Sequence, residues 1–271
     1  MRTHTIRNIA ATASNTKALQ GLRRALQQSS ANRVLKRYLP SKFGRHPIYV
    51  TASATLEYLL PSPWCFDDAL LRFASEYVKA DSIVWDIGAN VGAFSVAAAS
   101  IAIHGSTLAV DADPFLVSLL QRTTRHASNH ALNIQTLCTA IGAKNGLATF
   151  CIARNGRASS FLATAKGRAA AGGSTIQQIV PITTLNALQE TFPSPTIIKI
   201  DVEGAEMDVL RGGAECIQKH RPVMLIEVGH DCVPQATDLL KEWGYELRSG
   251  QLEDFNQPID LCKTNTIAIP A

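Results

Sequence analysis

From residue 81 onward, short runs of apolar and β-branched residues alternate with stretches of helical periodicity. This alternation is typical of a parallel sheet whose strands are joined by crossover helices. Strands are expected at residues 82–87, 107–110, 134–140, 196–200, 223–228, 245–248 and 264–269, and helices at 91–103, 114–128, 205–219 and 234–243. No helical pattern separates the last two strands, which permits an antiparallel pairing. We therefore predict an α/β, Rossmann-like sheet of seven strands, mostly parallel with an antiparallel last strand and with helices on both faces.

Basic residues are concentrated at the start of the chain. Residues 1–56 hold ten of the 26 Lys and Arg residues and none of the 22 Asp and Glu residues. We predict a basic N-terminal extension over residues 1–56, partly helical or disordered, and one domain over residues 57–271 with its core motifs in 82–230. An amphipathic helix is expected near residues 16–28 and another helix at residues 66–78.

Three roles suit the basic extension. Its composition is typical of a disordered tail. Residues 1–40 also suit an anionic membrane surface, where each basic residue contributes about 1 kcal/mol. An acid-free segment with Arg and Ser is, thirdly, compatible with a transit peptide. Nucleic acid is not an expected partner, because Tyr38 is the sole Phe, Tyr or Trp in the first 40 residues and base stacking needs aromatic side chains.

The six cysteines are scattered, without a Cys-x-x-Cys pair or a histidine at zinc spacing. This pattern favours a location in the reducing cytoplasm, either free or attached peripherally to a membrane. No spacing of Cys, His, Asp or Glu residues requires a metal ion. No apolar stretch reaches the roughly 18 residues that a membrane span needs. Residues 146–175 are rich in Gly, Ala and Ser, and we interpret them as a hairpin followed by a mobile loop. Acceptor specificity is expected from this segment and from residues 40–80.

A glycine-containing loop follows the first predicted strand, where residues 86–92 read Asp-Ile-Gly-Ala-Asn-Val-Gly. Glycine at position 88 lets the backbone turn sharply and approach a ligand closely. Open α/β sheets bind ligands at this carboxyl edge. The loop lacks the three glycines of G-x-G-x-x-G, so a ligand without a pyrophosphate is favoured. The alternative is an ordinary strand–turn–helix junction.

Acidic residues are expected beside this loop. Asp111 follows the second predicted strand, where a carboxylate can accept hydrogen bonds from both hydroxyls of a ribose; alternatively, it belongs to a solvated turn. Asp201 and Glu203 follow the strand at residues 196–200. Neighbouring carboxylates are costly unless a cation binds, so a positively charged sulfonium is favoured over a phosphate. The alternative is that these acidic residues lie at the N-terminus of the next helix, where negative charge complements the helix dipole. This explains Glu203 but explains Asp201 poorly, because Asp201 lies at the end of a buried strand.

Together these segments resemble the FkbM family of methyltransferases, over roughly residues 80 to 230. The family motifs D-x-G-A-N-x-G, E-P-x-P, I-K-I-D-V-E-G-A-E, V-L-x-G and P-x-x-x-x-E correspond to residues 86–92, 111–114, 198–206, 209–212 and 222–227. Three positions depart from the family pattern, and one of them is Ala112, which stands where the family has Pro. Asp111 stands where the family has Glu, which keeps both acceptor oxygens, and Asn186 stands where the family has Asp.

The resemblance implies a methyltransferase that uses S-adenosyl-L-methionine to methylate a hydroxyl on a sugar, a glycan or glycolipid, or a related natural product. The cofactor-binding residues expected from the motifs are Asp86, Gly88, Ala89, Asn90, Gly92, Asp111, Ala140, Asp201 and Glu203. A hydroxyl acceptor benefits from a general base. The candidates for that role are Asp201, Glu227 and His230.

Two other classes of function remain as alternatives. One is a nicotinamide-dependent oxidoreductase on a similar sheet, against which the missing G-x-G-x-x-G motif and the Asp201/Glu203 pair both count. The other is a non-catalytic module that binds a nucleoside or a nucleic acid through the basic extension.

Overall fold

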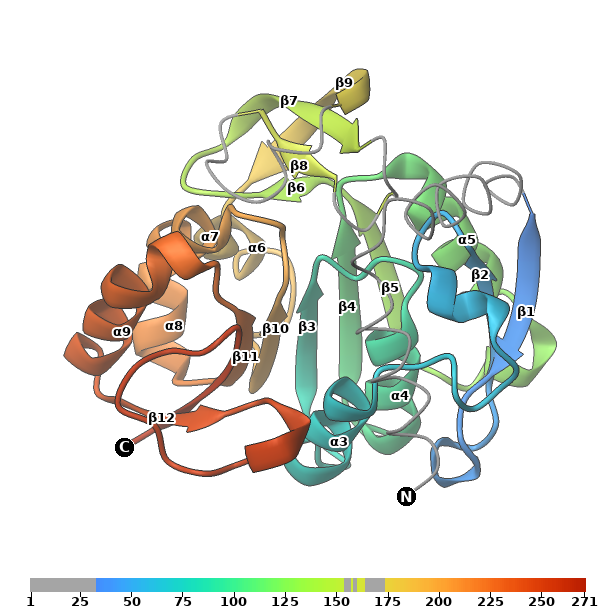
Figure 1. Ribbon diagram of the computed structural model, residues 1–271, viewed down its shortest axis with the longest axis horizontal. Coiled ribbons are helices and arrows are strands. Elements are labelled where there is room, and N and C mark those ends of the chain that lie inside the picture. Colours follow the sequence, from blue (N-terminus) through green and yellow to red (C-terminus); the bar gives the residue numbers. More distant parts are fainter. Residues whose placement is uncertain (1–32, 154–156, 158–159, 164–173) are drawn as a thin grey trace, which may run out of the picture.

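The computed structural model describes residues 33–153, 157, 160–163 and 174–271 (Figure 1). The amphipathic helix expected near residues 16–28 lies outside these described residues. Within them, no helix is long and apolar enough to cross a lipid bilayer.

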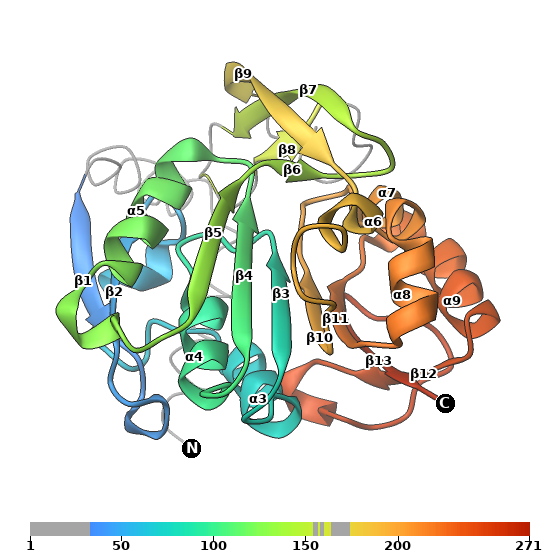
Figure 2. The same cartoon turned by 180° about the vertical axis from the view of Figure 1, so that it is seen from behind.

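The centre of the molecule is a sheet of seven strands in the order β12-β13-β11-β10-β3-β4-β5 (Figures 1 and 2). Its strands are β3 (Ile83–Ile87), β4 (Ser106–Asp111), β5 (Ile134–Cys138), β10 (Ile197–Ile200), β11 (Val223–Glu227), β12 (Tyr245–Ser249) and β13 (Asn265–Pro270). The pairs β11–β10, β10–β3, β3–β4 and β4–β5 are parallel, whereas β13 is antiparallel to both β11 and β12. The predicted α/β class and the mostly parallel sheet with antiparallel pairs at one end are confirmed.

Helices cover both faces of this sheet because its central strands are apolar on both sides. The helices are α3 (Asp68–Tyr77), α4 (Ala93–Ile101), α5 (Pro114–Thr124), α6 (Leu185–Leu188), α7 (Glu206–Gly212), α8 (Ala214–His220) and α9 (Val233–Glu242). Val84 of β3 is buried in a cluster with residues of α3, α4 and α5, whereas its neighbour Trp85 is buried in a cluster with residues of α7, α8 and α9. The alternation of side chains along a strand thus divides the core into two layers.

The helix predicted at residues 205–219 is two helices, α7 and α8, which meet at Gly213. A Cβ atom on Gly212 would lie 2.1 Å from the carbonyl oxygen of Gly142. The backbone of this glycine therefore packs directly against a neighbouring segment, and the chain bends where two glycines follow each other.

A second sheet, which the sequence did not predict as such, lies beyond the carboxyl ends of β4 and β5 (Figures 1 and 2). Its order is β6-β9-β7-β8, from β6 (Ala140–Ile141), β7 (Gly146–Ala153), β8 (Phe161–Leu162) and β9 (Ser174–Thr183). The predicted hairpin is present as β7 and β8, but β9 was missed. The strand predicted at residues 134–140 is also divided, because Thr139 separates β5 from β6.

Residues 33–56 are part of the folded domain, which differs from the expectation of an extension over residues 1–56. They form a hairpin of β1 (Val34–Tyr38) and β2 (Pro47–Thr51) beside α5. Phe43, Ile48 and Val50 are fully buried in the same core cluster as α3 and α4. Short 3-10 helices complete the fold at Ser41–Phe43, Leu56–Leu59, Ala127–Asn129, His230–Cys232 and Leu252–Asp254.

Candidate functional site

A cavity of about 340 Å³ opens at the carboxyl ends of β3, β4, β10 and β11. Eight of the predicted site residues line it: Gly88, Ala89, Asn90, Asp111, Ala140, Asp201, Glu203 and Glu227. The remaining three, Asp86, Gly92 and His230, are not among the lining residues. Parallel strands that end at one edge thus bring together residues that are up to 139 positions apart.

The loop over residues 86–92 wraps tightly because three of its residues have positive φ angles. These are Gly88 at 79°, Asn90 at 53° and Gly92 at 86°. A Cβ on Gly88 would lie 1.8 Å from the backbone oxygen of Asp201, so the loop packs directly on the end of β10. A Cβ on Gly92 would lie 2.2 Å from Leu120, which explains Gly92 as a packing residue between α4 and α5.

Asp86 lies beneath the loop and is fully buried. Ser95 donates a hydrogen bond of 2.5 Å to its Oδ2, and the Nζ of Lys199 lies 3.5 Å from its Oδ1. Lys199 and Asp86 meet because they are register partners on the adjacent strands β10 and β3. Burial raises the pKa of Asp86, while Lys199 and Ser95 oppose that shift. Asp86 therefore anchors the loop from below rather than facing the cavity.

Lys199 connects three parts of the site, although the sequence analysis assigned it no role. Its Nζ lies 3.2 Å from Oδ2 of Asp201 and donates a 2.7 Å hydrogen bond to the carbonyl oxygen of Gly88. Burial lowers the pKa of Lys199, but the carboxylates of Asp201 and Asp86 outweigh burial and raise it overall. Asp201 was expected to need a bound cation beside it; this expectation is wrong, because Lys199 of the chain itself supplies one positive charge between Asp201 and Asp86.

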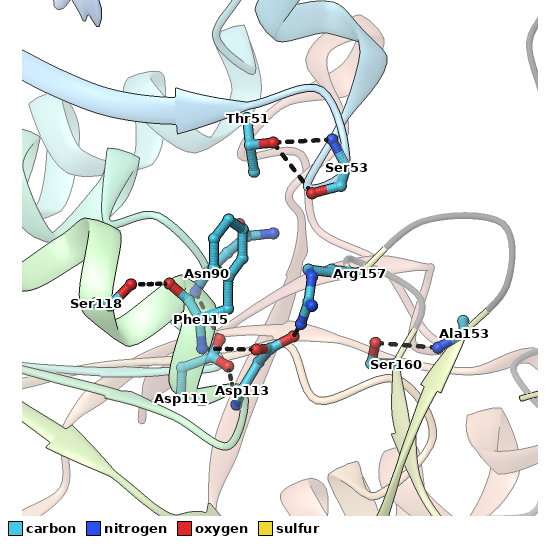
Figure 3. Close-up of polar contacts among 10 residues, drawn as sticks. All are labelled: Thr51, Ser53, Asn90, Asp111, Asp113, Phe115, Ser118, Ala153, Arg157 and Ser160. Carbon is cyan, nitrogen blue, oxygen red and sulfur yellow. Dashed lines mark hydrogen bonds and ion pairs between the residues drawn. The ribbon is translucent and has the colours of Figure 1, made fainter. Parts of the chain in front are cut away.

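Asp111 joins the loop to the start of α5, as Figure 3 shows. Its Oδ2 accepts a 2.7 Å hydrogen bond from the backbone N–H of Asn90, and its Oδ1 accepts a 2.8 Å bond from that of Asp113. Burial raises its pKa to about 7 despite these two donors. Each carboxylate oxygen keeps a second lone pair, so Asp111 can still accept two hydrogen bonds from a ligand in the cavity.

Arg157 covers this corner of the cavity and was not predicted (Figure 3). Its guanidinium pairs with the buried carboxylate of Asp113 at 2.5 Å and lies 4.7 Å from the ring centre of Phe115. Its backbone N–H donates to the carbonyl oxygen of Ser53 at 2.6 Å. A single residue from the segment between β7 and β8 therefore ties the N-terminal hairpin region to the start of α5.

Glu227 ends β11 beside the end of β10, as expected from the sequence. Burial, together with the charges of Asp201 and Glu203, raises its pKa to about 8. His230, by contrast, is exposed and lines a neighbouring hollow, which shares Glu203 and Glu227 with the cavity. The structure thus places Asp201 and Glu227 on the cavity and His230 outside it.

The raised pKa of Glu227 predicts how stability changes with pH. Below its ordinary pKa of 4.5 the carboxyl is protonated in both the folded and the unfolded chain. Between pH 4.5 and about 8 the unfolded carboxyl ionises first, so its contribution to folding stability falls as pH rises and stays low above about 8. We expect Glu227→Gln to raise the Tm by a few degrees at pH 9 and to leave it unchanged at pH 4.5.

Thermal unfolding at the two pH values measures this, with Glu215→Gln as a control that removes the same charge at an exposed position. An equal Tm difference at both pH values would contradict the raised pKa.

Many cavity residues carry no motif and were missed. They come from the segment that leads into α3, from α3 itself, and from the second sheet and its connections: Thr55, Glu57, Tyr58, Cys65, Asp67, Leu70, Phe150, Ser160 and Leu162. The sequence indicated only that specificity would come from residues 40–80 and 146–175. These residues meet at the cavity only because segments distant in the sequence pack together in the folded chain.

Asn186 does not line the cavity. Its side-chain oxygen accepts a 3.0 Å hydrogen bond from the backbone N–H of Cys216 in α8. Asparagine and aspartate both offer such an acceptor. The departure from the family pattern at this position therefore leaves a structural hydrogen bond in place.

Residues 86–247 match the family model of the methyltransferase FkbM domain, which is more than half of the chain. The chain belongs to the FkbM methyltransferase family. The cofactor of this FkbM methyltransferase is S-adenosyl-L-methionine, and the cavity fits it, because Asp111 keeps a second lone pair on each carboxylate oxygen and the Gly88 loop lines the same cavity.

The FkbM chain also resembles solved methyltransferase structures. The methyltransferase FkbM from Methylobacillus flagellatus KT is 16% identical with a TM-score of 0.47, and the match covers 80% of this chain and 58% of that one. The precorrin-6y C5,15-methyltransferase from Geobacter metallireducens GS-15 is 12% identical with a TM-score of 0.43, covering 74% and 86%. No curated protein sequence matches the chain. Within the described ranges, no group of three or more His, Cys, Asp or Glu residues is placed to hold a metal ion.

Proposed function

We propose that this methyltransferase transfers a methyl group to a hydroxyl oxygen on a sugar, a glycan or glycolipid, or a related natural product. The observation that carries the proposal is that Asp111 and the Gly88 loop border the same cavity as two adjacent carboxyl groups, Asp201 and Glu227. Asp111 and the Gly88 loop suit a cofactor that contains a nucleoside. Asp201 and Glu227 suit the removal of a proton from the acceptor hydroxyl.

Cofactor binding is assigned to the loop side of the cavity. Asp111 accepts hydrogen bonds from the ribose hydroxyls, and the loop at Gly88, Ala89 and Asn90 contacts the cofactor closely. Asp201 and Glu203 lie where negative charge stabilises the sulfonium and the amine. When bound, S-adenosyl-L-methionine supplies a methyl group on a positively charged sulfur.

Acceptor activation is assigned to the ends of β10 and β11. Glu227 has a pKa of about 8, which suits a group that takes a proton from a hydroxyl near neutral pH. Asp201 is held by Lys199 and orients the acceptor or shares the proton. Since His230 lies outside the cavity, we assign it no direct part in this step.

A binding screen tests the proposal against its two alternatives. Adenosylhomocysteine at a hundred times its Kd should raise the free energy of unfolding by about 2.7 kcal/mol, which is visible as a higher Tm. NADH and short RNA should produce no shift. A shift with NADH alone would instead indicate an oxidoreductase. Glycosyl acceptors are then screened by mass spectrometry for the gain of one methyl group.

We propose in addition that residues 1–40 attract the chain to an anionic membrane surface, so that it acts in the cytoplasm as a peripheral enzyme. Support comes from the charge pattern alone, with eight basic residues and no acidic residue in this segment. Basic segments are drawn to anionic lipids, and salt weakens the attraction. A lipid-linked glycan acceptor suits such a location.

A further inference from the structure

Four large apolar side chains are exposed on two chain segments, one in β1 and one whose neighbouring residues line the cavity. Tyr38 is 39% exposed, and Leu59, Leu60 and Trp64 are 38%, 43% and 55% exposed. We call these four residues the apolar rim. Single exposed apolar residues are ordinary on a protein surface, whereas a group of them indicates a binding surface.

Hydrogen bonds hold the two parts of the apolar rim side by side. Ser62 accepts a 2.8 Å hydrogen bond from the backbone N–H of Tyr38. The Nε of Arg37 donates to the carbonyl oxygen of Tyr58 at 2.9 Å, and its Nη2 donates to that of Leu59 at 3.3 Å. The segment carrying Leu59 and Leu60 therefore runs along β1, and the rim is part of the fold.

The same segment forms a wall of the cavity with its other side chains. Thr55, Tyr58 and Cys65 line the cavity, and Tyr58 and Cys65 are buried. Leu59, Leu60 and Trp64 lie between Tyr58 and Cys65 in the sequence and are exposed to solvent. A partner bound at the apolar rim is therefore separated from the cavity by this one chain segment.

The charges around the apolar rim favour an anionic partner. Residues 33–64 contain five basic residues and one acidic residue, Glu57, which lines the cavity. Arg33 and Lys36 are exposed, and the Nζ of Lys36 lies 5.8 Å from the ring centre of Tyr38. Exposed Trp and Tyr beside basic side chains are typical of contact with the headgroup region of a bilayer. A purely apolar protein partner does not need this charge.

We infer that the apolar rim docks the mouth of the cavity on an anionic lipid bilayer, so that a lipid-linked hydroxyl reaches the cavity without leaving the membrane. Trp64, Leu59 and Leu60 enter the headgroup boundary, and Lys36 and Arg33 contact anionic headgroups. The identity of the acceptor rests on the proposed function. The docking itself does not, because it can be measured without methyl transfer.

Co-sedimentation of the full chain with vesicles tests this docking surface. Vesicles of phosphatidylcholine are compared with vesicles that also contain phosphatidylglycerol. We expect binding to the anionic vesicles, and a fall in the partition coefficient of at least about 10-fold for the double variant Leu60→Ser/Trp64→Ser. The matched control is Leu147→Ser/Ile179→Ser, which removes two equally apolar side chains that are 75% and 67% exposed on β7 and β9. The control should bind like the unchanged protein.

Quenching of tryptophan fluorescence by brominated lipid is the second measurement, and it needs no destabilising variant. Of the three tryptophans, Trp85 is fully buried and Trp243 is partly buried against the core cluster of α7, α8 and α9, so quenching should come mainly from Trp64 and fall sharply in Trp64→Phe. Equal binding of the rim and control variants, or quenching that persists in Trp64→Phe, would overturn the inference. Loss of a dimer rather than of vesicle binding would also overturn it, since the rim would then bind a second copy.

These outcomes are distinct from a failure of the proposed function. The rim variant should keep the Tm shift with adenosylhomocysteine, which reports the cofactor site. If no hydroxyl acceptor is ever methylated, the vesicle result still stands. If the protein methylates a water-soluble acceptor but does not bind vesicles, the docking surface is rejected and the proposed function is retained.

Discussion

Replacing Asp111 with alanine should weaken adenosylhomocysteine binding by roughly 2–4 kcal/mol, which is about 30-fold to 900-fold in Kd. Asp111 lines the cavity with one lone pair left on each carboxylate oxygen, and alanine removes both of the charge-assisted hydrogen bonds that we propose for a ribose. It also removes the acceptors for the backbone N–H groups of Asn90 and Asp113, so the loop loses its fixed shape. Calorimetric titration measures the loss.

Asp111→Glu is the control, because it keeps both oxygens and restores the residue usual in the family; it should retain most of the affinity. The pH dependence gives a second readout. Since the pKa of Asp111 is raised to about 7, affinity should strengthen as pH rises through about 7 in the unchanged protein and stay flat in Asp111→Ala. Unchanged affinity in a folded Asp111→Ala variant would falsify the assignment of this residue to the ribose.

Replacing Asp201 with asparagine should lower the rate of methyl transfer by at least about 100-fold, the usual scale for a lost base or electrostatic partner. Asparagine keeps the shape of the side chain but removes its charge from the cavity wall. Lys199 then has Asp86 as its remaining ion-pair partner, so positive charge increases in the part of the cavity that we assign to the sulfonium. Single-turnover transfer to an identified acceptor measures the change.

Asp208→Asn is the matched control for this variant. Asp208 lies in the following helix, α7, and its side chain is 42% exposed beside Arg211, so the same chemical change occurs away from the cavity. Its rate should equal that of the unchanged protein. A near-normal rate for Asp201→Asn, with cofactor binding intact, would exclude Asp201 from the chemistry.

The sheet and the loop side of the cavity could be predicted because their signals are local. Continuous apolar runs such as residues 223–226 indicate strands buried on both faces, and Gly88 indicates a turn that no other residue fits. The carboxyl ends of parallel strands meet at one edge, so the position of Asp111 and Asp201 at strand ends placed them together without knowledge of the packing.

Other features were misjudged because local patterns are shared by different structures. The hairpin of β1 and β2 was taken for an extension, since its basic composition masked the alternation that buries Ile48 and Val50. Strand β9 was missed because it pairs with β7 across a long connection and contains Pro181. The composition of a segment says nothing about the strand it pairs with, although cross-strand contacts are what stabilise a β-strand.

The sequence by itself determined the fold class, the glycine loop and the acidic residues that border the cofactor cavity, because each depends on residues within a few positions of one another. Only the tertiary structure decided that Lys199 pairs with both Asp86 and Asp201, that Arg157 reaches Asp113, and that His230 stays outside the cavity. These contacts depend on strand register and on segments distant in sequence. Register and long-range packing arise from the balance of the whole core, which no single stretch of residues encodes.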